Sequence, residues 1–160
     1  MNSFIRIIDG LNARGVQYVV VGGFAAYIHG SRRVTFDLDL VVDLRPDEAR
    51  KAIEALLAVG LQSRLPVDPL MFADANERSR WIAEKNMIVF TLVDPASPGF
   101  AVDLFVDSPI DFSTLVSNAR TIEIEGRRVC VCSVDDLIEM KTRAGRPQDL
   151  LDVEALRRLK

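Results

Sequence analysis

Two aspartates one residue apart lie within an apolar segment, and this feature constrains the fold more than any other. The segment FDLDLVVD, residues 36–43, has the aliphatic, β-branched composition of a buried strand. Successive strand side chains point to opposite faces, so Asp37 and Asp39 share one face, with Cα atoms about 7 Å apart. Two carboxylates on one face repel each other and are costly to remove from water. We therefore expect a cation or a basic partner beside them.

A third aspartate lies in a similar setting. Asp103 is in the middle of FAVDLFVD, residues 100–107, which also has the composition of a strand. If the two strands are neighbours, at a spacing of about 4.8 Å, Asp103 joins Asp37 and Asp39. A site with only oxygen ligands favours Mg²⁺ or Mn²⁺ over zinc. Each acid also has an ordinary alternative, because Asp-x-Asp is common at strand ends and turns, and Asp103 alone could be a paired structural acid.

The glycine pair Gly22-Gly23 follows the apolar run YVVV directly. Glycines at a turn from a strand to a helix leave backbone N–H groups open to an anion such as phosphate. A tight turn without a ligand is the simpler alternative. The order of the glycine pair, the two aspartates and the later Asp103 predicts metal-assisted phosphoryl or nucleotidyl transfer.

Length and composition limit the class of protein. A chain of 160 residues is long enough for one domain with a real core. Its apolar content of 49% and mean hydropathy of +0.15 are high, which is compatible with a partner surface or a homo-oligomer. The longest apolar run, YVVVGGFAAYI, is too short to span a membrane. The first residues lack a secretory pattern, so we expect a cytoplasmic protein.

The periodicity of apolar residues predicts a mixed α/β (α+β) domain over residues 1–160, with a small mixed sheet flanked by helices. The predicted helices cover residues 3–13, 23–30, 46–59, 133–145 and 146–160. The predicted strands cover residues 16–22, 36–43, 86–95 and 100–107, with a hairpin over 120–133. The strands on either side of the turn PASPG should pair antiparallel.

Two further segments carry less definite expectations. Residues 61–72 could hold a short strand and a turn, and ANERSRWIAEK, residues 75–85, is either a helical turn or a surface loop. Ser133 and Asp136 have the spacing of a capping box. Cys130 and Cys132 alternate in one strand, too close for a disulfide, and are expected to be buried structural thiols.

Two longer strings resemble a known family. GGFAAYIHGSRRVTFDLDLVV, residues 22–42, and the later Asp103 resemble the nucleotidyltransferase superfamily of DNA polymerase β-like enzymes. The same string looks like the small bacterial branch of AbiEii-type toxins and minimal nucleotidyltransferases. LIEMKTRAGRPQDLLDVEAL, residues 137–156, is similar to the C-terminal Lys, Arg and Asp motif of that branch. Residues 60–95 have no counterpart.

The resemblance implies a nucleotidyltransferase fold and a role for each matching residue. Asp37, Asp39 and Asp103 would bind Mg²⁺ or Mn²⁺, and Asp103 would help to deprotonate the acceptor. An NTP would be the co-substrate. The residues that would bind or surround its phosphates are Gly22, Gly23, Lys141, Arg146 and Asp149.

Residues near the aspartate strand have two interpretations each. Arg32, Arg33 and Thr35 precede it and could contact nucleotide or acceptor, or could be ordinary loop residues. His29 could have a structural or capping role, or contact phosphate or acceptor. A separate group could form a local basic patch for RNA, since the net charge of −3 gives no overall attraction to nucleic acid. That group is Arg127, Arg128, Arg143 and Arg146.

The leading functional interpretation is an enzyme that moves a nucleoside monophosphate from an NTP to an acceptor hydroxyl and releases pyrophosphate. The acceptor could be tRNA or another RNA, a protein side chain, or an antibiotic. By resemblance, the biological setting is the toxin of a toxin–antitoxin pair, with an antitoxin protein as partner and no membrane association. The alternatives are a non-catalytic module of the same fold that binds a nucleotide or a protein, and a structural or antitoxin-like subunit.

Overall fold

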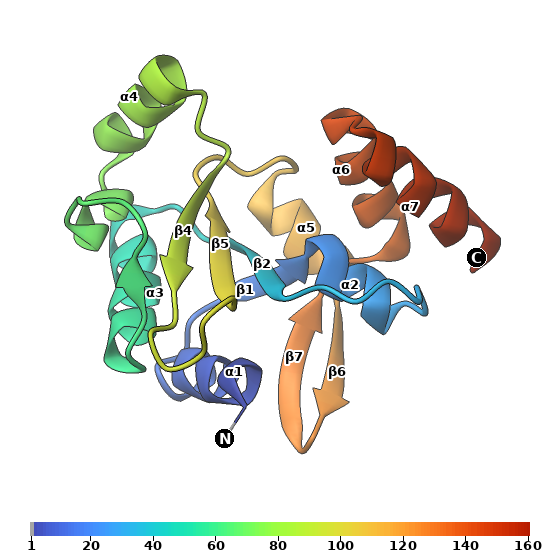
Figure 1. Cartoon of the computed structure of the whole chain (residues 1–160), viewed down its shortest axis with the longest axis horizontal. Coiled ribbons are helices and arrows are strands. Elements are labelled where there is room, and N and C mark those ends of the chain that lie inside the picture. Colours follow the sequence, from blue (N-terminus) through green and yellow to red (C-terminus); the bar gives the residue numbers. More distant parts are fainter. Residues whose placement is uncertain (1) are drawn as a thin grey trace.

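A single mixed sheet forms the centre of the chain in the computed structural model, which describes residues 2–160 (Figure 1). Its seven strands have the order β3-β4-β5-β2-β1-β7-β6. The strands are β1 (Tyr18–Val21), β2 (Asp37–Val42), β3 (Gln62–Ser63), β4 (Val89–Val93), β5 (Ala101–Phe105), β6 (Arg120–Ile124) and β7 (Arg127–Val131). The predicted mixed α/β fold is confirmed.

Short helices surround this sheet. They are α1 (Ser3–Ala13), α2 (Gly22–Ile28), α3 (Pro46–Ala58), α4 (Ala75–Lys85), α5 (Phe112–Asn118), α6 (Val134–Ala144) and α7 (Pro147–Arg158), with a 3₁₀ helix η1 (Pro69–Ala73). Helix α1 packs against α3 and β7, while α2 contacts β1, β2 and α6, and α6 packs along α7. No helix within residues 2–160 has the length and apolar character needed to cross a membrane.

The central strands bring distant residues into one row. Strand β2 is antiparallel to β1 and parallel to β5, and β5 is antiparallel to β4. Asp39 lies directly opposite Asp103, and Asp103 lies directly opposite Thr91. Directly paired residues project to the same face of a sheet. The predicted neighbourhood of the two aspartate strands is therefore confirmed, as is the antiparallel pair around PASPG.

The middle of the chain is better ordered than its sequence indicates. ANERSRWIAEK is a full helix, α4, which begins after Asp74, whose carboxylate accepts hydrogen bonds from the N–H groups of Asn76 and Glu77. Trp81 stacks on Phe90 of β4 with ring centroids 5.1 Å apart. This buried aromatic contact holds α4 against the sheet. Sequence analysis also missed α5 and η1, which are short and lack a full apolar period.

Two smaller predictions need correction. Ser133 caps α6 by accepting a hydrogen bond from the N–H of Asp136, but the Asp136 carboxylate accepts from Nδ2 of Asn118 at 3.2 Å. Asp136 thus links α6 to the end of α5 and does not complete a capping box. Cys132 is buried as predicted, whereas Cys130 is only half-buried, and both thiols are free.

Candidate active site

The candidate site is the sheet face that carries the paired aspartates. Asp37, at the start of β2, is exposed, while Asp39 and Asp103 are half-buried in the adjacent strands β2 and β5. Leu38 and Leu40 alternate with the aspartates of β2 and are fully buried on the other face. The alternation that predicted one acidic and one apolar face is therefore observed.

Gly22 is required by the close approach of Asp39. Its φ of +67° lies in the left-handed region, which glycine adopts without steric cost. A Cβ atom on Gly22 would lie 2.0 Å from Oδ2 and 2.9 Å from Cβ of Asp39. The whole Asp39 side chain thus fills the space that a side chain at position 22 would need. The neighbouring Gly23 similarly leaves room for Thr35, whose Cβ would be 3.2 Å from an added Cβ.

Burial and like charge act together on the two paired carboxyl groups. Burial, with the nearby charges of Asp103 and Asp37, raises the pKa of Asp39 to about 7, although the backbone N–H of Gly23 and the charge of Lys141 oppose the rise. Burial also raises the pKa of Asp103, against the hydrogen bond from Thr91 and the charge of Arg64. The face is thus an electrostatically costly place for carboxylates, which is typical of a functional site.

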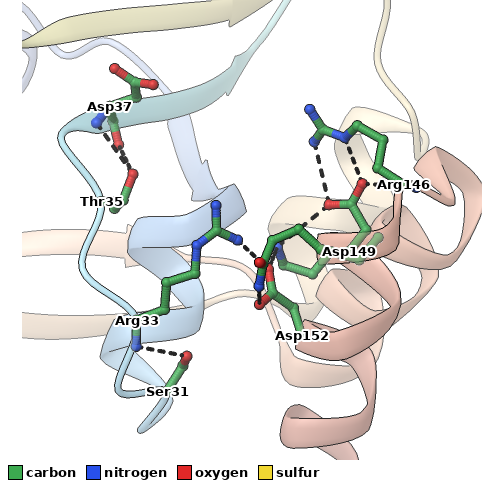
Figure 2. A network of polar contacts seen from close by, with 9 residues as sticks. Ser31, Arg33, Thr35, Asp37, Arg146, Asp149 and Asp152 are labelled. Carbon is green, nitrogen blue, oxygen red and sulfur yellow. Dashed lines mark hydrogen bonds and ion pairs between the residues drawn. The ribbon is translucent and has the colours of Figure 1, made fainter.

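Asp37 is fixed through its backbone. The N–H of Asp37 donates to Oγ1 of Thr35 at 3.3 Å, and this turn places Thr35 between β2 and Gly23. Of the three residues predicted from this loop, Thr35 therefore lies at the glycine turn. Arg33 points instead toward α7 (Figure 2).

A network of ion pairs joins this loop to the two C-terminal helices (Figure 2). One oxygen of Asp152, Oδ2, accepts from Nη1 of Arg33 and from Nζ of Lys141, both at 2.8 Å. Asp149 is 3.9 Å from Nζ of Lys141 and accepts from Nε of Arg146 at 2.6 Å. The network therefore connects the loop before β2 with α6 and α7, and it includes the predicted residues Arg33, Lys141, Arg146 and Asp149.

The network lies within electrostatic range of the aspartate face. Burial favours the neutral form of Asp149 and of Asp152, but hydrogen bonds and nearby cations outweigh it and lower both pKa values. Arg146 and Lys141 act on Asp149, while Lys141, Gln148 and Arg33 act on Asp152. The charge of Lys141 also acts on Asp39, and that of Asp39 on Arg146. The network thus contains three cations and two carboxylates, a net charge of +1.

The remaining residues predicted to contact nucleotide, acceptor or RNA lie outside this network. His29 caps the end of α2, and its Nε2 lies 2.7 Å from the carbonyl oxygen of Cys132, which supports a structural role. Arg32 is exposed on the loop. The four arginines proposed as one basic patch are separated: Arg127 and Arg128 start β7 on the projecting β6–β7 hairpin, while Arg143 and Arg146 belong to α6 and the α6–α7 connection (Figure 1). The patch prediction is therefore wrong.

Sequence reasoning missed two residues of this region. Asp152 lies three residues after Asp149, on the same side of α7, and this spacing was its only signal. Thr91 is the one polar residue in the run MIVFTLV, and its position opposite Asp103 follows only from the register of β4 with β5.

Two cavities lie elsewhere in the molecule. They have volumes of about 220 and 400 Å³, adjoin each other, and share Gln17 and Val116 in their linings. Gln17 directly precedes β1, whereas Gly22 directly follows it. These cavities are thus at the opposite end of β1 from the paired aspartates.

Comparison with known proteins adds a family to this geometry. The family model described as "Nucleotidyl transferase AbiEii toxin, Type IV TA system" matches residues 6–160, almost the whole chain. The chain belongs to the AbiEii nucleotidyltransferase family. No curated protein matches the sequence.

Solved structures with the same fold are also nucleotidyltransferases. A Thermotoga maritima structure described as a nucleotidyltransferase has a TM-score of 0.60 at 16% identity, covering 97% of this chain and 88% of that one. A lincomycin-bound lincosamide adenylyltransferase has a TM-score of 0.63 at 12% identity, covering 98% and 96%. The antibiotic-resistance factor ANT(2'')-Ia has a TM-score of 0.60 at 13% identity, covering 98% and 80%. At these identities the likeness establishes the fold.

The donor groups on the aspartate face of this AbiEii chain match the ligand preference of a divalent cation. Oxygen-only donors on one face of adjacent strands match the ligand preference of Mg²⁺. Within residues 2–160, no three His, Cys, Asp or Glu side chains are arranged as a ready-made metal site. The backbone nevertheless places Asp39 and Asp103 directly opposite each other. The donor chemistry therefore fits a hard cation.

A substitution at Gly22 tests the close approach to Asp39. Gly22→Ala should lower the free energy of unfolding by more than Gly15→Ala, because both glycines have nearly equal φ, +67° and +65°, but nothing lies within 4 Å of an added Cβ at Gly15. The backbone strain alone is about 1–2 kcal/mol, and displacing Asp39 adds about 1–3 kcal/mol. Urea unfolding of both variants measures the difference. Equal losses would show that Asp39 does not occupy this space.

The electrostatic cost at Asp39 gives a second test. Asp39→Asn should stabilise the protein in chelator at pH 8, by on the order of 1–3 kcal/mol, because the amide keeps the shape and removes a half-buried charge that faces Asp103. Asp47→Asn, at an exposed carboxylate in the first turn of α3, is the matched control and should lose a few tenths of a kcal/mol. Thermal unfolding measures both. A destabilised Asp39→Asn variant would contradict the electrostatic account.

Proposed function

We propose that the chain is a metal-dependent nucleotidyltransferase that moves a nucleoside monophosphate from an NTP to an acceptor hydroxyl. The observation that carries this proposal is the pairing of Asp39 with Asp103 across β2 and β5, beside the glycine turn. Family membership over residues 6–160 supports it. Asp37, Asp39 and Asp103 would hold Mg²⁺ or Mn²⁺, which would neutralise charge on the phosphates and lower the pKa of the acceptor hydroxyl.

Asp103 is the proposed proton acceptor. It lies directly opposite Asp39 in the adjacent strand, so a hydroxyl that approaches the cation would meet its carboxylate. The acceptor O–H would give its proton to Asp103, and its oxygen would form a bond to the α-phosphorus. The bond between the α-phosphorus and the bridging oxygen would break, and pyrophosphate would leave with that electron pair. Asp37 and Asp39 would orient the phosphates through the cation.

The phosphates would lie between the glycine turn and the ion-pair network. Backbone N–H groups of Gly22 and Gly23 would face them from one side, next to Thr35. Lys141, Arg33 and Arg146 would face them from the other, as far as their pairs with Asp149 and Asp152 allow. These two carboxylates would hold the cations in place before the nucleotide arrives.

The biological setting is also a proposal. The description of the matching family as the toxin of a type IV toxin–antitoxin system supports a toxin with an antitoxin counterpart. One structural neighbour is named as an antibiotic adenylyltransferase and another as an antibiotic-resistance factor, which makes a small-molecule acceptor the second candidate. The aspartate face does not distinguish among these acceptors, so RNA and protein hydroxyls are tested together with small molecules.

Transfer of label from α-labelled NTPs tests the reaction. We expect label on one acceptor class among total RNA, the protein itself, and a panel of aminoglycosides and lincosamides, in Mg²⁺ or Mn²⁺. Asp37→Asn/Asp39→Asn should lose at least about 100-fold in rate, because it removes two cation ligands.

The matched control is Asp47→Asn/Asp135→Asn, which removes two exposed carboxylates in the first turns of α3 and α6. It should retain wild-type activity. Metal-dependent NTP binding without any transfer would support the non-catalytic module of the same fold. Equal activity of the site variant and its control would overturn the proposed site.

A further inference from the structure

The Asp103 carboxylate is hydrogen-bonded by a residue of β4, the strand next to β5 on the side away from β2. Thr91 lies directly opposite Asp103 in the antiparallel β4–β5 ladder, and its Oγ1 donates a hydrogen bond to Oδ1 of Asp103 at 2.6 Å. We propose that Thr91 is a positioning residue, which fixes the plane of the Asp103 carboxylate and leaves Oδ2 free for the cation and the acceptor proton. The inference rests on the function proposed above.

The contact has the geometry of a strong hydrogen bond. A separation of 2.6 Å lies in the range of charge-assisted O–H···O⁻ bonds, which are stronger than neutral ones. A carboxylate in a strand otherwise turns about its terminal torsion over a broad range. Within residues 2–160, Oδ2 of Asp103 accepts no side-chain hydrogen bond. One oxygen is therefore fixed, and the other is available.

The hydroxyl at position 91 has no evident packing role. Val89 and Val93 lie two residues away on either side of Thr91, so they share its face of β4 and are similarly half-buried. A valine at position 91 would match these neighbours in shape and in strand propensity. The hydroxyl is the feature that distinguishes Thr91 from them, and its acceptor is Asp103.

The edge strand supports the same position. The N–H of Arg64, directly after β3, donates to the carbonyl oxygen of Thr91 at 3.1 Å. This bond ties the backbone of β4 at Thr91 to the β3 edge. The Arg64 charge also acts on Asp103 and favours its ionised form. The segment 60–95, in which the sequence analysis named no functional residue, thus contributes Thr91 and Arg64 to the placement of the third carboxylate.

Mn²⁺ binding tests the inference without relying on turnover. Thr91→Val should weaken Mn²⁺ binding about 10-fold, measured by electron paramagnetic resonance with and without a non-hydrolysable NTP analogue, because loss of a residue that orients a ligand typically has this effect. Thr91→Ser keeps the hydroxyl and should bind Mn²⁺ as the wild type does. Thr121→Val, on exposed β6, is the matched control and should leave binding unchanged. All three variants should keep a wild-type unfolding temperature within a few degrees.

The outcomes separate this inference from the proposed function. Weaker binding by Thr91→Val, restored by Thr91→Ser, supports the inference even if no acceptor is ever labelled, in which case the proposed reaction alone fails. Wild-type Mn²⁺ binding by Thr91→Val overturns the inference. The proposed reaction is unaffected by that result if the wild-type protein transfers label. If the wild-type protein binds no Mn²⁺ in either condition, the inference and the metal-dependent reaction are overturned together.

Discussion

The repulsion between Asp39 and Asp103 is the constraint on which the rest of the site depends. The two carboxylates lie directly opposite each other on parallel strands, and burial adds to the cost of their charge. A fold selected for stability alone would place valines there, as it does along β1. The cost is understandable if a cation and a nucleotide complete the site, since such ligands bind most strongly where uncompensated charge is held in place.

The surrounding elements follow from this constraint. Gly22 supplies the space into which Asp39 extends, and no larger residue fits there. Helices α6 and α7 bring Lys141 and Arg146 toward the same face, with Asp149 and Asp152 between them. Within residues 2–160, neither cation forms an ion pair with the site aspartates. The arrangement suits a ligand that carries phosphates and cations together.

Much of this could be predicted from local sequence patterns. The period of two in FDLDLVVD placed Asp37 and Asp39 on one face, and the turn PASPG fixed the pairing of β4 with β5. Asp152 and Thr91 could not be found in this way, because their roles depend on which strands and helices meet. Helix α4 packs on the sheet through the stacking of Trp81 on Phe90, and apolar periodicity does not reveal such a contact between distant elements. The four arginines of the predicted basic patch illustrate the same limit, since sequence gives residue type but not distance.

The central claim is that Asp37, Asp39 and Asp103 together hold a divalent cation that carries a nucleotide. The most direct test is a crystal structure of the protein with Mn²⁺ and a non-hydrolysable NTP analogue, with Mn²⁺ located by anomalous scattering. The account predicts an anomalous peak between the carboxylates of Asp39 and Asp103, with the triphosphate between Gly22 and Lys141. A nucleotide bound elsewhere, or Mn²⁺ with no aspartate ligand from β2 or β5, would contradict it.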